Sequence, residues 1–139
     1  MGTRSLFVAD DREEALHLAD VGLRRAAARF AAAVLPGQAP RLGPQAPLAE
    51  LIAAYDVHVG TPDDVIASLQ ADTALARTTD IVFQVHSVDP PHEHILRSIE
   101  LTATHVAPAL GWVRKHPVAT PAASLAPTPF SSTRTEVLA

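Results

Sequence analysis

The polar side chains best suited to chemistry lie in or just after two short apolar segments of this sequence, residues 57–60 and 80–86. Together they form a candidate site that comprises His58, Gln84, His86, Ser87 and Asp89. Histidines and carboxylates at the ends of parallel strands are the groups from which barrel enzymes build their active sites. Proximity cannot be judged from spacing alone, so no Ser-His-Asp arrangement is readable, and we assign no catalytic residue.

Strand alternation predicts where three of these side chains point. Successive side chains of a strand lie on opposite faces, so Gln84 and His86 oppose the apolar residues of their segment. His58 likewise opposes Val57 and Val59. If both apolar faces pack on helices, His58, Gln84 and His86 point together to the other side of the sheet. That side is either the mouth of a working site, with Ser87 and Asp89 on the adjoining loop, or a polar face that only meets water, which we favour.

Other chemically suggestive groups have simpler interpretations. His92 and His94 are two residues apart, whereas helical metal ligands need i, i+4 spacing, so we expect no metal site. Asp63 and Asp64 lie where a helix start favours acidic residues, and we interpret them as capping groups. Gly60–Thr61 precedes the same helix and could receive a phosphate, but a single glycine is far from a phosphate-binding loop.

Composition bounds the class of protein. The chain has 139 residues, enough for one modest domain, and its hydrophobic content of 47% is typical of a folded protein. It has no cysteine, which excludes disulfides and thiolate chemistry. A net charge of −4 without a basic cluster argues against nucleic-acid or anionic-membrane partners. Without an apolar span or a signal-like N-terminus, a cytoplasmic location is expected.

The elements that would hold the site alternate between strand and helix. We expect strands over residues 5–9, 56–60 and 80–86. The predicted helices run from a cap at Asp10 or Asp11 to residue 35, over residues 48–55, from Pro62 onward with an apolar stripe of Val65, Ile66 and Leu69, and over residues 92–110. In the last helix Glu93 and Arg97 form an i, i+4 pair, and one side carries Ile95, Leu96, Ile99, Ala103, Val106 and Leu110. The second strand leads into Thr61–Pro62, where Thr61 caps the helix, Pro62 takes its first position and Asp64 supplies a capping-box acid. Strands that alternate with helices imply a parallel α/β sheet with right-handed crossovers. Residues 117–139, rich in Pro, Ala, Ser and Thr, are expected to be disordered.

Two segments resemble the C-terminal end of the bacterial-luciferase-like family of flavin-dependent monooxygenases. Residues 57–65, VHVGTPDDV, resemble the family's V-G-(S/T)-P-(D/E)-x-V turn. Residues 91–100, PHEHILRSIE, with VAPAL at 106–110, resemble its closing helix. More weakly, Phe7–Asp10 with Glu13, Glu14 and Ala15 resembles the family's V-A-(D/E) unit. The likeness covers roughly residues 5–112.

The resemblance implies a (β/α)₈ barrel, which needs roughly 250 residues and eight strands. This chain supplies about three βα units, so we expect residues 1–116 to be the C-terminal part of such a barrel. The implied cofactor is reduced FMN or a deazaflavin, although binding by this chain alone is not expected. A partner chain with the N-terminal strands, or self-association, would complete the barrel. The resulting function is a fragment of a flavin-dependent oxidoreductase that is inactive alone. The alternative is a non-catalytic interaction or ligand-binding α/β module derived from that barrel.

Overall fold

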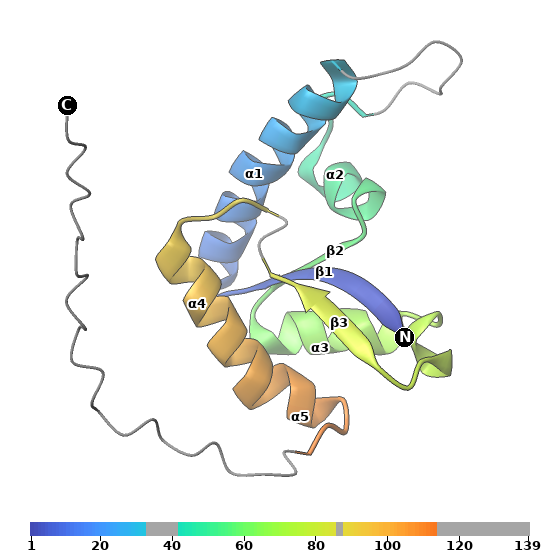
Figure 1. The fold of residues 1–139 in the computed structure, drawn as a ribbon. Helices are drawn as coiled ribbons and strands as arrows, with labels where there is room; N and C mark the ends of the chain where they lie inside the picture. Colours follow the sequence, from blue (N-terminus) through green and yellow to red (C-terminus); the bar gives the residue numbers. More distant parts are fainter. Residues whose placement is uncertain (33–41, 86–87, 114–139) are drawn as a thin grey trace, which may run out of the picture.

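The computed structural model describes residues 1–32, 42–85 and 88–113 (Figure 1). Its elements in chain order are β1 (Gly2–Val8), α1 (Arg12–Ala32), α2 (Leu48–Ala54), β2 (Val57–Gly60), α3 (Pro62–Ala71), the 3₁₀ turn η1 (Leu75–Arg77), β3 (Ile81–Gln84), α4 (His92–Leu101), the π-helical η2 (Thr102–Val106) and α5 (Ala107–Ala109). The predicted alternation of strand and helix is therefore confirmed. The predicted tail, residues 117–139, and the predicted end of the first helix lie outside the described residues.

The described strands form an open parallel sheet in the order β2-β1-β3. The central strand β1 pairs with β2 through Ser5 and Val57, and with β3 through Gly2 and Ile81. Three consecutive units of a (β/α)₈ barrel would instead place their strands in sequence order, with the second strand in the middle. The α/β class and the parallel sheet are as expected, whereas the strand order is not that of a barrel segment.

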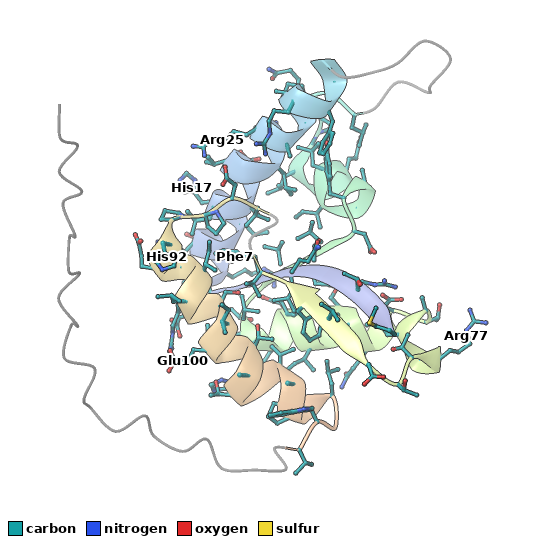
Figure 2. The ribbon with its side chains drawn as sticks, in the orientation of Figure 1. Phe7, His17, Arg25, Arg77, His92 and Glu100 are labelled. Atoms are coloured by element: carbon teal, nitrogen blue, oxygen red, sulfur yellow. The ribbon has the colours of Figure 1, made fainter. Side chains whose placement is uncertain are left out.

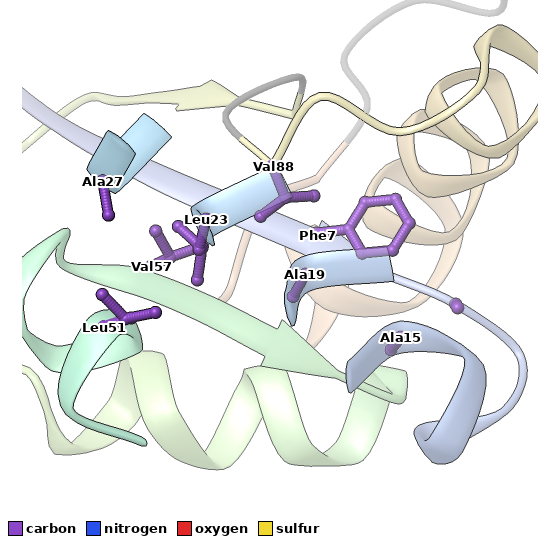
Figure 3. Packing of buried hydrophobic residues seen from close by; sticks show 9 residues of the cluster. Phe7, Ala15, Ala19, Leu23, Ala27, Leu51, Val57 and Val88 are labelled. Carbon is purple, nitrogen blue, oxygen red and sulfur yellow. The ribbon is translucent and has the colours of Figure 1, made fainter. Parts of the chain in front are cut away.

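Helices cover both faces of this sheet, as a parallel sheet requires. One core cluster lies between the sheet and helices α1 and α2, and Figure 3 shows Phe7, Leu23 and Val88 meeting in it. The second cluster lies on the opposite face, where Leu6 and Val8 pack against Val65 and Leu69 of α3 and against Leu101 and Val106 from the C-terminal helical segment. The sheet is thus a middle layer. Within the described ranges, no helix has the length and apolar character needed to cross a bilayer.

Local capping chemistry sets the helix starts. Asp11 accepts the backbone N–H of Glu14 at 2.9 Å, which caps α1 as predicted. At α3 the full capping box is present, because the Thr61 hydroxyl accepts the Asp64 N–H while the Asp64 carboxylate accepts the Thr61 N–H at 3.1 Å. Pro62 occupies the first turn. These contacts fix the direction in which each helix leaves its strand.

The closing helix buries only part of the predicted apolar side, because Val106 and Leu110 pack in the second core cluster while residues nearer its start do not. Its apolar stripe was expected to share one side, yet Leu96 and Ile99 are 55% and 47% exposed. Ser98 and Leu101 are buried instead. The reason is a polar contact, since Val8 at the end of β1 donates its N–H to the Ser98 hydroxyl at 3.0 Å. The helix turns its Ser98 side toward the sheet to satisfy that backbone donor.

Candidate functional site

His58 lies on β2 and points into the core beneath α3. It pairs with Leu6 across the sheet, and the residue is only 7% exposed. Its Nδ1 lies 2.7 Å from the hydroxyl oxygen of Ser68 on α3. The other ring nitrogen, Nε2, is buried and has no hydrogen-bond partner among the described residues. Burial lowers the pKa of His58 below its usual value, because the charged imidazolium loses its hydration.

Gln84 lies on the other face of the sheet from His58. It pairs with Ser5 on β1, and Ser5 and Leu6 point to opposite sides. The expectation that His58 and Gln84 point together is therefore wrong. It assumed that the apolar faces of the two strands lie on one side, whereas Val57 packs in the first core cluster and Phe83 against the second. His86 and Ser87 lie outside the described residues.

Asp89 lies in the connection from β3 to α4, on the surface. Its backbone has a positive φ of 52°, and its carboxylate lies 3.4 Å from the guanidinium of Arg25 on α1. The preceding Val88 is fully buried against α1. Here the helix carries Gly22, where a Cβ would meet the Val88 backbone. Asp89 therefore directly follows the point where the β3–α4 connection packs tightly on α1. Its described ion-pair partner is the exposed Arg25, which is not a candidate-site residue.

A charge cluster that was not predicted lies at the opposite end of the sheet, near His58. Arg4 on β1 binds Asp72 at the end of α3, and its Nε lies 3.6 Å from Asp56. The hydrogen bond from Arg4 lowers the pKa of Asp72. The sequence offered only a weak signal, because Arg4 directly precedes the predicted strand at residues 5–9, and a charge that a strand end partly buries needs a partner. Which acid provides it depends on the strand order.

The weaker of the segments that resemble the luciferase-like family, around Asp10, lies against the resembling segment at residues 91–100. Arg97 on α4 makes a two-armed contact with Asp10 after β1, with Nε to Oδ2 at 2.8 Å and Nη2 to Oδ1 at 2.6 Å. It also binds Glu100 at 2.7 Å, so the expected pairing of Arg97 with Glu93 is replaced. The hydrogen bond from Arg97 lowers the pKa of Asp10. The adjacent Ser98 takes the Val8 N–H, so both residues fasten α4 to the carboxyl end of β1.

The remaining candidates have structural surroundings. His92 is exposed at the start of α4, with Glu100 further along the same helix (Figure 2). His94 lies 3.9 Å from Glu14. Across the described ranges, no group of three or more histidine and acidic side chains is arranged to hold a metal. The Asp64 carboxylate already occupies the start of α3, where a phosphate would have to bind. Gly60 is required beside it, because at φ 147° a Cβ would lie 2.6 Å from the Asp64 Cβ.

One hollow of about 380 Å³ lies away from all these groups, beside the end of α1. It is lined by Phe30, Leu42, Ala54 and Tyr55. The rings of Phe30 and Tyr55 are 6.0 Å apart, so the lining is mostly apolar. This surface can take apolar groups, and among its described lining residues Tyr55 alone carries a polar side-chain group.

Comparison with known proteins adds no assignment to this geometry. No family model matches the sequence, and no curated protein matches it.

Proposed function

We propose that this chain is a C-terminal segment derived from a luciferase-like flavin-dependent oxidoreductase, and that alone it is a non-catalytic α/β module. One observation carries the proposal. Asp10, from the first resembling segment, contacts Arg97, from the last, and Val8 contacts Ser98 beside them. Asp10 lies in the weaker resembling segment and Arg97 in a stronger one, and their contact across 87 positions supports reading both segments as parts of one inherited unit.

The contacts of the polar side chains favour a structural role for them over a catalytic one. Asp10 is engaged by a guanidinium, and Asp64 caps its own helix. His58 is buried beneath α3. None of these groups is offered to a substrate, so the reduced FMN or deazaflavin of the family would be held mainly by a partner chain. When bound, that flavin supplies the redox chemistry, and this chain supplies packing behind it.

We also propose that this chain can form part of a barrel, provided that its strands change their pairing. In a barrel β2 would lie between β1 and β3, whereas here β1 occupies the middle. Assembly with a partner would therefore require β3 to leave β1 and form a new pairing. The β3 edge is the less buried one, since β3 carries exposed Val82 and Gln84 while Val57, His58 and Gly60 of β2 are buried. Exchange at β3 is the less costly route.

Two measurements test this proposal. The purified chain is titrated with FMN, oxidised and anaerobically reduced, and flavin fluorescence is followed. We expect no saturable binding; micromolar binding would refute the non-catalytic half. The chain is then co-expressed with a luciferase-like oxidoreductase truncated just before its V-G-(S/T)-P turn. We expect a stable complex that regains reduced-FMN binding, and an Arg97→Ala variant should assemble less well. Failure of the wild-type chain to associate would refute the derivation from that barrel.

The second candidate is a self-contained interaction or ligand-binding module, and the strand order favours it. With β1 in the middle and helices on both faces, the described residues bury two apolar clusters without any partner. A ligand site that combines His58 with Gln84 is not available to it, because they lie on opposite faces. Cooperative unfolding of the isolated chain, together with no association with the truncated oxidoreductase, would favour this candidate.

A further inference from the structure

His58 is the one described side chain with a buried polar atom that lacks a hydrogen-bond partner. A neutral imidazole has one N–H and one bare nitrogen, and Nδ1 uses either of them with the Ser68 hydroxyl. Whichever tautomer is present, Nε2 stays unpaired. Protonation makes both nitrogens donors and adds a charge, while the buried Nε2–H still has no acceptor. The site therefore holds the neutral ring more readily than the charged one.

The charged groups around His58 do not remove this penalty. Asp56 comes just before β2, and Asp72 ends α3; both attract an imidazolium. Arg4 on β1 lies among them and repels it. Arg4 also binds both carboxylates, which weakens their attraction for a protonated His58. Burial remains the dominant influence and lowers the pKa of His58.

The contact between His58 and Ser68 joins β2 to α3, the helix that packs over this face of the sheet. His58 belongs to β2, an edge strand, and Ser68 to α3, which packs Val65 and Leu69 over the sheet. We propose that His58 is a pH-sensitive latch: the neutral ring can stay buried and hold α3 through Ser68, whereas the ring protonated in mild acid favours a state in which α3 moves off the sheet and the charged ring meets water. Release would hydrate the charged ring and uncover the second core cluster. This inference concerns the chain itself and does not depend on flavin chemistry.

The latch is tested by hydrogen exchange of the full chain between pH 7.5 and pH 5, after correction for the intrinsic pH dependence of exchange. We expect opening of α3 and β2 to increase by up to about tenfold for each unit that the pH falls below the unfolded-state pKa of histidine, until the pH passes the lowered folded-state pKa of His58, with little change in α1. His58→Asn keeps a polar group near the Nδ1 position but cannot titrate, so its α3 should lose this dependence. His17→Asn, at an exposed histidine, is the matched control and should behave like the wild type.

Equal pH dependence of α3 exchange in the wild type and His58→Asn would overturn the proposal. A second measurement covers the case in which that variant does not fold. The ring proton signals of His58 in the wild-type protein are followed by NMR through the titration. A midpoint below 6.5, accompanied by broadening of α3 amides, is expected. A midpoint at or above 6.5 would overturn the latch.

Discussion

Replacing Gly22 with alanine should destabilise the protein strongly, although the same change in an open helix stabilises. Gly22 lies within α1, where alanine is favoured over glycine by roughly 1 kcal/mol. Here an added Cβ would lie 3.0 Å from the Val88 Cα and would overlap its carbonyl group. Those atoms are backbone, so no rotamer change can relieve the overlap. The connection from β3 to α4 would have to move away from α1.

The cost follows from what that movement exposes. Val88 is fully buried in the cluster with Phe7 and Leu23, as Figure 3 shows, and burying such a side chain contributes about 1.5–3 kcal/mol. Overpacking strain adds about 1–3 kcal/mol. After the helix-propensity gain, we expect Gly22→Ala to lower the free energy of unfolding by about 1.5–5 kcal/mol. For a domain of this size, that corresponds to a melting temperature about 6–20 °C lower.

Urea and thermal unfolding followed by far-UV circular dichroism measure this effect. Gly43→Ala is the matched control, because a Cβ there meets nothing within 4 Å. Its stability should stay within about 0.5 kcal/mol of the wild type, as for ordinary surface changes. If Gly22→Ala were as stable as the Gly43 variant, or more stable than the wild type, the close packing of Val88 on α1 would be refuted.

Three further changes have expected outcomes. Ser98→Ala should cost about 1–3 kcal/mol, because it leaves the buried Val8 N–H without an acceptor; urea unfolding measures it, and a neutral result would mean that another acceptor takes the bond. Thr61→Ala should cost about 1 kcal/mol by removing the α3 cap, whereas Thr61→Ser should retain most of it; equal losses in both variants would contradict the capping role. Asp72 has a lowered pKa through Arg4, so its contribution is complete above pH 3.8, the usual pKa, and is lost as the pH falls through the folded-state value. Stability measured from pH 6 to pH 2 should therefore fall less steeply in Asp72→Asn, and identical slopes would argue against the ion pair.

The sequence was sufficient for structure that depends on near neighbours. The capping box needs only Thr61 and Asp64, three residues apart, and the strand-to-helix turn follows from it. Asp11 capped α1 for the same reason. Each of these contacts closes within one helical turn, so the local residue types determine it.

The relative positions of the strands could not be predicted in the same way. The alternation of side chains along a strand correctly placed His58 on the opposite face of β2 from Val57. It does not reveal whether the apolar side chains of β2 and those of β3 lie on the same face of the sheet. In a parallel sheet both faces are buried, so both carry apolar residues and the pattern is ambiguous. Gln84 was consequently assigned to the wrong side. The pairs Arg4–Asp72 and Asp10–Arg97 were missed because each joins β1 to a helix distant in sequence, α3 after β2 and α4 after β3, and the sequence does not reveal how those helices pack against β1.

The central place of β1 has a consequence for biosynthesis. Of the described strands, β1 is synthesised before both of its partners, because Ser5 pairs with Val57 and Gly2 with Ile81. The N–H of Val8 at its end likewise binds Ser98, which comes later still. Until those partners have been made, β1 has both edges open, which exposes it to aggregation and makes it a target for chaperones on the nascent chain. Completion of the sheet therefore requires contacts between distant parts of the chain, and such contacts form slowly.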